Sequence, residues 1–322
     1  MRSLRTSWLP LLLGLISGYL FLSGFIGSGK KAQASKDETN EWQGPDINLL
    51  PNTEEGNMIR YGRELIANTS TYLGPKGRVM QVSNGMNCQN CHVESGTRAF
   101  GNALAIAAKT YPKFRPRSGK IESLEFRINE CMERSLNGQA LDSQSKEMKA
   151  MKAYLLWIGK GLKPGMTLAG FTTIELPYLT RAADQVAGKQ IFETQCVRCH
   201  GFDGSGLMLP DSSGYLYPPL WGLGSYNTSA GLYRISRLAA FIKYNMPFNP
   251  VQTPPQLSDE DAWDLAAYIS SQPRPEKKFS YDWPKLETKP PDFPFGPYAD
   301  AFSEKQHKYG PFTPIKEAAK KL

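Results

Sequence analysis

The chain has 322 residues, a formal net charge of +8, five cysteines and three histidines. This length is sufficient for two domains that each have a hydrophobic core. The charge does not indicate a nucleic-acid-binding protein. Residues 1–34 carry four basic and no acidic side chains, so the remainder has a net charge of +4, and no Lys/Arg block of the kind that forms a basic patch is visible.

The N-terminus has the features of a secretory signal. Arg2 and Arg5 precede an apolar run over residues 8–26, and Ala32-Gln33-Ala34 provides a small-x-small cleavage site. We therefore expect residues 1–34 to be a signal peptide and the mature chain to be periplasmic. The alternative is an uncleaved membrane anchor, because the nineteen-residue apolar run is close to the length of a membrane span.

The next stretch leads to the first motif. Residues 35–51 are polar and lack periodicity, which predicts a loop. Residues 54–67 predict a helix, because apolar side chains recur there at helical spacing. Gly62 would let this helix cross another one closely. A Gly- and Pro-containing loop over residues 72–87 follows.

Two copies of the pattern Cys-x-x-Cys-His carry the clearest chemical signal. They occupy residues 88–92 (CQNCH) and 196–200 (CVRCH). In this pattern two cysteines attach a haem through thioethers and the histidine supplies the proximal iron ligand. The alternative, zinc, would need two nearby Cys/His pairs for each ion, and the chain has only five cysteines and three histidines.

The sequence therefore predicts two covalently bound haem c groups, each with one iron. The predicted attachment residues and proximal ligands are Cys88, Cys91, His92, Cys196, Cys199 and His200. This assignment leaves Cys131 and His307 without a role. It also agrees with export, because haem c is attached outside the cytoplasm.

The region between the motifs is predicted to be helical with one charged loop. Residues 103–108 predict a short helix, and residues 121–135 predict a longer one that ends at Asn137-Gly138. Cys131 lies on the apolar stripe of the longer helix. The loop over residues 111–119 carries three cations, Lys113, Arg115 and Arg117.

The first half ends with an amphipathic helix around residues 148–158, which is followed by a Gly/Pro-containing linker over residues 159–170. The second half repeats the plan of the first. Residues 187–192 lead into the second motif as residues 61–66 lead toward the first. The last predicted helix begins at residue 258 with a capping-box pattern.

The predicted fold class is mainly α, with two tandem small cytochrome c-type domains and an extended Pro-rich C-terminal strap. We expect an N-terminal domain with the catalytic haem over residues 35–165 and a C-terminal domain with the electron-exit haem over residues 166–272. Residues 273–322 contain nine prolines and several aromatics. We expect them to pack over the domains as the strap.

Each haem iron also needs a distal ligand or an open position. In the second domain Met246 is favoured over Met208, because it lies between two predicted helices and Pro247 holds its loop rigid. A thioether ligand raises the reduction potential, which suits a haem that passes electrons on. In the first domain Cys131 lies 39 residues past His92. It is either a thiolate ligand or a buried core cysteine, and the rival ligands are Met132, Met148 and Met151.

Several longer segments resemble the thiosulfate dehydrogenase family, which are dihaem cytochromes c that join two thiosulfate ions into tetrathionate. The matching segments are SNGMNCQNCH (83–92), YPKFRPRSG (111–119), NECMERSLNG (129–138), YPPLWGLGSYN (217–227), NMP (245–247), PPDFPFGPYADAF (290–302) and QHKYGPF (306–312). Seven segments in one order are far more specific than two haem motifs. The resemblance covers the chain from about residue 61 to residue 315.

The resemblance implies an enzyme, thiosulfate:cytochrome c oxidoreductase, that also has the capacity to reduce tetrathionate. It implies that Cys131 is the distal ligand of the catalytic haem and that Arg117 helps to hold the anion. The electron acceptor would be soluble or membrane-bound, such as another cytochrome c. The alternative is a non-catalytic dihaem electron carrier in which Cys131 is structural.

The sequence departs from the family pattern at one position. Some members carry a lysine directly before the second-domain methionine and use it as a ligand, whereas this chain has Asn245. His200 with Met246 is therefore the simpler ligand pair. Lys243 remains the alternative for a ligand switch.

Overall fold

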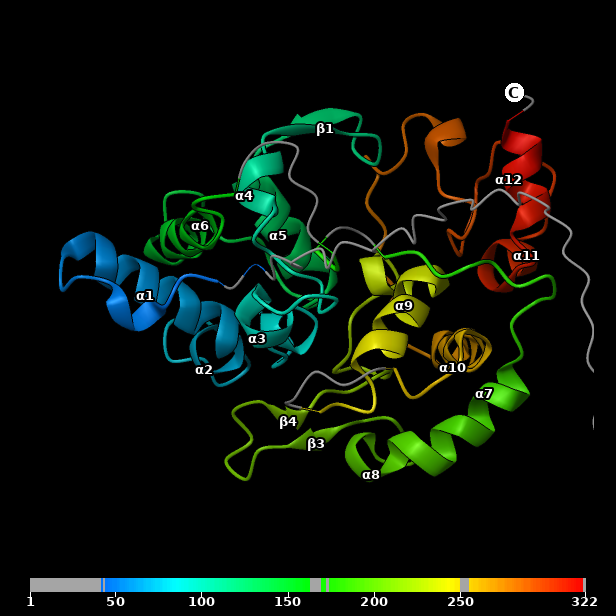
Figure 1. Ribbon diagram of the computed structural model, residues 1–322, viewed down its shortest axis with the longest axis horizontal. Coiled ribbons are helices and arrows are strands. Elements are labelled where there is room, and N and C mark those ends of the chain that lie inside the picture. The colour runs from blue at the N-terminus through cyan, green and yellow to red at the C-terminus, as the bar shows by residue number, and fades with distance from the viewer. Residues whose placement is uncertain (1–41, 43, 163–168, 172–173, 250–254, 321–322) are drawn as a thin grey trace, which may run out of the picture. The chain divides into compact units, whose positions relative to one another are not determined.

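The computed structural model describes residues 42, 44–162, 169–171, 174–249 and 255–320. The predicted signal peptide or anchor and part of the predicted linker lie outside these residues. Within them the chain is mainly helical, with two short β-hairpins (Figure 1). None of the described helices has the length and apolar character that a membrane crossing requires.

The first domain is organised by the crossing of its first and last helices, α1 (Glu54–Ala67) and α6 (Lys146–Ile158). Thr53 accepts a hydrogen bond from the Gly56 N–H and so caps the start of α1. A Cβ at Gly62 would lie 1.9 Å from the carbonyl oxygen of Ala150 on α6. The close crossing expected at Gly62 is confirmed.

Short elements connect these two helices. They are α2 (Thr69–Leu73), η2 (Cys88–Asn90), α3 (Val93–Gly96), α4 (Ala107–Thr110), β1 (Lys113–Arg115), β2 (Lys120–Glu122) and α5 (Leu124–Arg134), preceded by η1 (Ile47–Leu49) before α1. The prediction of a helix over residues 103–108 is wrong, because the helical turn begins only at Ala107.

The loop predicted over residues 111–119 and the helix start predicted at residue 121 are also wrong. β1 and β2 form an antiparallel hairpin in which Phe114 pairs with Ile121 and Arg115 with Lys120. Ile121 therefore lies in a strand and is 74% exposed, outside the helical stripe assigned to it. The helix α5 begins three residues later, where Ser123 accepts a hydrogen bond from the Phe126 N–H.

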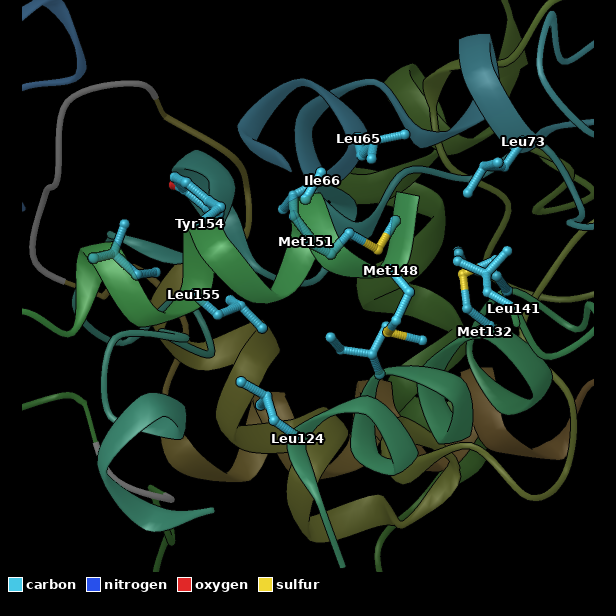
Figure 2. Close-up of a cluster of buried hydrophobic side chains, with 14 of the residues drawn as sticks. Leu65, Ile66, Leu73, Leu124, Met132, Leu141, Met148, Met151, Tyr154 and Leu155 are labelled. Carbon is cyan, nitrogen blue, oxygen red and sulfur yellow. The ribbon is translucent and has the colours of Figure 1, made fainter. Parts of the chain in front are cut away.

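The core of the first domain is one cluster of buried side chains (Figure 2). Leu65 and Ile66 come from α1, Met148 and Met151 from α6, and Met132 from α5. All five are almost completely buried. The three methionines named as rival iron ligands are thus core residues of the same cluster, where a flexible thioether fills irregular space well.

The second domain repeats the crossing. Its elements are α7 (Gln185–Ile191), the π-helical turn η3 (Phe192–Cys196), α8 (Val197–His200), β3 (Leu207–Met208), β4 (Tyr215–Tyr217), η4 (Gly231–Tyr233), α9 (Ile235–Asn245) and α10 (Asp259–Ser271). α10 packs against both α7 and α9. A Cβ at Gly188 on α7 would lie 1.9 Å from the Asp264 carbonyl oxygen on α10. The capping box predicted at Ser258 is confirmed.

The C-terminal residues carry η5 (Leu286–Thr288), α11 (Glu304–Tyr309) and α12 (Thr313–Ala319). Asp282, which precedes them, forms ion pairs with Arg117 and Arg134 of the first domain. Phe312 and Ile315 are buried in the core cluster of the second domain. The two helices α11 and α12 were not predicted, and the extended strap stays a prediction.

Candidate functional site

Hydrogen bonds hold the first and the last residue of the first haem motif, Cys88 and His92. The Thr69 hydroxyl accepts a hydrogen bond from the Cys88 N–H at 3.0 Å and lies 3.2 Å from the Cys88 sulfur. The Nδ1 atom of His92 lies 2.5 Å from the carbonyl oxygen of Asn102. This bond fixes the imidazole ring and leaves Nε2 as the nitrogen that can bind iron.

Cys131 faces this motif from α5. It is half-buried, and its thiol lies close enough to His92 and Arg127 for both to act on its charge. Burial raises the pKa of the Cys131 thiol, but the Arg127 guanidinium and His92 outweigh burial and bring the pKa below its usual value. Burial raises the pKa of Cys88 to about 11 and that of Cys91 to about 12. Of the three cysteines in this site, Cys131 is thus the one favoured as a thiolate.

Arg127 is a site residue that our sequence prediction missed. It lies one helical turn before Cys131 on α5, and the negative charge of Cys131 is the largest cause that raises the pKa of Arg127. Its guanidinium also contacts Glu130 at 3.3 Å. The spacing of four residues between an arginine and a cysteine on one helix was the signal available in the sequence.

Arg117, the predicted anion-binding residue, lies in a buried ion network. Its guanidinium donates to Asp282 at 2.7 Å and to the Ser229 carbonyl oxygen at 2.8 Å. Asp282 also accepts two hydrogen bonds of 2.8 Å from Arg134. Arg134 contacts Glu130 at 3.2 Å, and Glu130 contacts Arg127. The network connects Arg117 to the helix that carries Cys131 through Asp282.

The other two cations of the β1–β2 hairpin differ in their surroundings. Lys113 is exposed. Arg115 lies 3.8 Å from the carboxylate of Glu122, which also accepts a hydrogen bond from the Ser118 hydroxyl at 2.7 Å. Glu122 is buried, and burial raises its pKa. Arg115 therefore has an acidic partner near the site, whereas Lys113 faces solvent.

The second haem motif has the same histidine geometry. The Nδ1 atom of His200 lies 2.8 Å from the Pro218 carbonyl oxygen, again leaving Nε2 for iron. Cys196 packs on the second core cluster, and Met246 packs on the same cluster. Cys199 is half-buried one residue before His200.

The rival distal ligands of the second site are engaged elsewhere. Lys243 donates a hydrogen bond of 2.7 Å to the Leu257 carbonyl oxygen and forms an ion pair of 2.9 Å with Asp259. Met208 lies in β3 and is 41% exposed. The partners of Lys243 and the exposure of Met208 favour Met246 as the distal donor.

The donor set of each site fits a haem c. Each site offers two cysteines in the thioether spacing and a histidine whose free nitrogen is defined by a backbone hydrogen bond. In the first site Cys131 adds a sulfur donor from a separate helix. In the second site Met246 adds a thioether.

Comparison with known families agrees with two cytochrome domains. Residues 78–163 match the family described as SoxA/TsdA, cytochrome c domain, and residues 185–273 match the family cytochrome c. The first match contains both His92 and Cys131, and the second contains both His200 and Met246. The chain therefore has two cytochrome c domains, each with a covalently bound haem c.

Curated relatives match most of the chain. Thiosulfate dehydrogenase from Stutzerimonas stutzeri is 35% identical over 85% of this chain and 87% of that protein. Thiosulfate dehydrogenase from Allochromatium vinosum is 37% identical over 78% of this chain and 90% of that protein.

A solved structure, thiosulfate dehydrogenase (TsdBA) from Marichromatium purpuratum, superposes with a TM-score of 0.67 at 29% identity. The match covers 78% of this chain and 52% of that chain, so this chain spans about half the length of that relative. The identities above 30% over most of both sequences place the protein in a family. The chain belongs to the thiosulfate dehydrogenase family of c-type cytochromes.

Proposed function

We propose that this protein oxidises two thiosulfate ions to one tetrathionate at the first haem site, with Cys131 as the reacting sulfur. Membership of the thiosulfate dehydrogenase family supports the reaction. The observation that carries the residue assignment is the position of Cys131, which contacts His92 and has its pKa lowered by Arg127 and His92 against the effect of burial.

The residues of each site have separate roles in this proposal. His92 and Cys131 would hold the first iron, and His200 and Met246 the second. The bound haems supply one-electron acceptors, so two electrons can be stored in one molecule. The hydrogen bonds from the histidine Nδ1 atoms to backbone carbonyl oxygens orient both proximal ligands.

The sulfur chemistry balances with these parts. The Cys131 thiolate would form a bond to the terminal sulfur of one thiosulfate, a two-electron oxidation for which the two bound haems would supply one oxidising equivalent each. The second thiosulfate would then attack the thiosulfate sulfur that is bonded to Cys131. This step forms tetrathionate, breaks the bond to Cys131 and returns the thiolate, so no proton transfer is needed.

Positive charge is required because the reaction brings anions together. Two unit charges 4 Å apart near a protein surface repel by about 4 kcal/mol. Arg127 lies beside the Cys131 thiol and is the nearest compensation. Arg117 is the second cation that we assign to anion binding, and its contact with Asp282 fixes the direction of its guanidinium.

The second haem would pass electrons to an external acceptor. The thioether of Met246 keeps the potential of this site high, which suits an exit. We propose a soluble or membrane-bound cytochrome c as the acceptor and the periplasm as the location. The same steps run backward would reduce tetrathionate.

Thiosulfate-dependent reduction of ferricyanide by the purified dihaem protein tests the function. We expect one tetrathionate for every two ferricyanide ions reduced, and no reduction when thiosulfate is omitted. The Cys131→Ala variant is the matched control. Reduction of ferricyanide without formation of tetrathionate would contradict the proposed product.

A further inference from the structure

The short segment over residues 100–102 contacts both the first haem motif and the second domain. At one end, the Asn102 carbonyl oxygen is the partner of the His92 ring. At the other end, the Phe100 N–H donates to the Gly170 carbonyl oxygen at 2.7 Å. Phe100 and Asn102 have φ angles of +61° and +52°. Residues other than glycine rarely adopt this backbone conformation, so the surroundings of the segment must hold it in place.

The second domain contacts this segment through two neighbouring residues. The side-chain Nδ2 of Asn245 donates to the Phe100 carbonyl oxygen at 2.9 Å. The ring of Tyr244 stacks on the ring of Phe100 with centroids 4.6 Å apart and an interplanar angle of 20°. Asn245 is 5% exposed and is the last residue of α9, so Met246 follows it directly.

The amide of Asn245 is fully committed as a donor. In addition to Phe100, it donates to the Phe241 carbonyl oxygen at 3.0 Å, so both N–H bonds of the amide are used. The two acceptors come from different domains, one from the segment over residues 100–102 and one from α9. The residue before Met246 is thus fixed in space by both domains.

We propose that Asn245 is a positioning residue that holds Met246 on the second iron and takes its support from the first cytochrome domain. The support for Met246 then comes from the same short segment, residues 100–102, that holds the proximal His92 ring. This inference rests on the proposed function, which makes Met246 the distal ligand. It assigns a role to Asn245, the residue that departs from the lysine of some family members.

The physical consequence is a shift in ligand exchange at the second iron. Met246 stays bound only as long as its loop remains in place, and an external ligand competes for the iron when the loop moves away. The apparent affinity of such a ligand follows the fraction of molecules with the methionine detached. Loss of two buried hydrogen bonds should increase that fraction on the order of tenfold.

The test uses the dihaem protein and imidazole as the competing ligand. Asn245→Leu keeps the size of the side chain and removes both donors. The readout is the methionine–iron charge-transfer band of the oxidised protein during imidazole titration. We expect the imidazole concentration that removes half of this band to fall on the order of tenfold. The thiolate spectrum of the first haem should not change.

Asn227→Leu is the matched control. Asn227 is also fully buried, and its Nδ2 donates across the domains to the Glu133 carbonyl oxygen at 2.8 Å and to Asn137 at 2.9 Å. It is distant in sequence from Met246, so its variant should keep the wild-type imidazole titration. A shift as large as that of Asn245→Leu would show general loosening between the domains and overturn the proposal.

A second variant makes a milder change at the same contact, so that the proposal can be tested even if Asn245→Leu does not fold. Phe100→Leu keeps the carbonyl acceptor and removes only the ring stacked on Tyr244, so a smaller shift in the same direction is expected. An unchanged titration in both the Asn245 and the Phe100 variants would overturn the proposal. Absence of the charge-transfer band from the wild-type protein would instead contradict the assignment of Met246 as ligand.

Discussion

The chemistry of Cys131 depends on its immediate neighbours. A cysteine buried in an apolar core has a raised pKa and is unreactive. Cys131 differs because the Arg127 guanidinium and the His92 ring outweigh the effect of burial. A pure electron carrier gains nothing from such an activated sulfur, so this environment favours the enzyme over the carrier.

Removal of the Cys131 sulfur should eliminate two observables together. We expect Cys131→Ala to lose the thiolate spectrum of the first haem and essentially all thiosulfate oxidation, because it lacks both the ligand and the reacting atom. Both haems should stay attached, which mass spectrometry of the variant checks. Cys131→Met should restore six-coordination without turnover, since a thioether cannot form the adduct. Turnover by either variant would contradict the mechanism.

Arg127 should contribute to the binding of thiosulfate and to the ionisation of Cys131. Because its side chain is about one third exposed, we expect Arg127→Ala to lower kcat/KM only roughly five- to thirtyfold, less than for a dry site. Steady-state kinetics at sub-saturating thiosulfate measures this loss. Arg127→Lys should recover part of it, because it restores the charge but not the planar guanidinium. Wild-type kcat/KM in the alanine variant would exclude Arg127 from the site.

Arg117 makes a different prediction, because it is also part of a structural ion network. Arg117→Ala should weaken thiosulfate binding by about 1.5–3 kcal/mol, the contribution of a charge-assisted hydrogen bond from a partly dry site. The dependence of rate on thiosulfate concentration measures the change. An Arg117→Ala variant with unaltered kinetics at sub-saturating thiosulfate would restrict this arginine to its contact with Asp282.

At the scale of elements, the β1–β2 hairpin should make stability depend on pH through Glu122. Burial raises the native pKa of this carboxyl above its usual value of 4.5, so the native state binds the proton more tightly than the unfolded state. The stabilising contribution is complete below the usual pKa and is lost as pH rises through the native pKa.

Replacing Glu122 with glutamine should remove this dependence while keeping an acceptor for Ser118. The free energy of unfolding of Glu122→Gln relative to the wild type should increase as pH rises from about 4.5 toward neutrality. Chemical denaturation of both proteins at several pH values measures the difference. A difference that is constant over this range would contradict the raised pKa.

The contact of the C-terminal residues with α5 depends on one carboxylate. Asp282 neutralises Arg117 and the almost fully buried Arg134. Asp282→Asn leaves the buried Arg134 with only Glu130 as an acidic partner and should lower the free energy of unfolding by about 3–5 kcal/mol. Asp203→Asn is the control, since its carboxylate binds only within an exposed loop at Ser205. Equal stabilities of the two variants would show that the ion network contributes little.

The elements differ in how well the sequence predicted them. The helix over residues 54–67 and the cap at Ser258 were predicted correctly, because apolar periodicity and capping are local signals. The β1–β2 hairpin was missed because its strands are three residues long and largely exposed, so they have no alternating pattern. The ion partner of Arg117 is 165 residues away at Asp282, which no local pattern can reveal.

At the scale of the whole molecule, the two domains share a close helix crossing at a glycine and a histidine held by a backbone carbonyl. Gly62 and Gly188 each allow the first helix of a domain to touch a carbonyl oxygen of the last helix. His92 and His200 each bind a backbone carbonyl through Nδ1. In the proposed function the domains differ at the distal position, with a thiol in one and a thioether in the other. This difference would separate sulfur chemistry from electron exit within one chain.

That separation predicts that a change at the exit leaves the chemical site intact. Met246→Gly should abolish the methionine–iron charge-transfer band and lower the potential of the second haem, because the thioether that favours the reduced iron is lost. Electrons from thiosulfate should then reach an acceptor cytochrome more slowly, while the affinity for thiosulfate stays nearly unchanged. Stopped-flow measurement of haem reduction by thiosulfate, followed by reoxidation with the acceptor, separates the two steps. An unchanged band would return the ligand role to Met208, and absence of the band from the wild-type protein would return it to Lys243. Weakened thiosulfate binding would show that the two sites do not act separately.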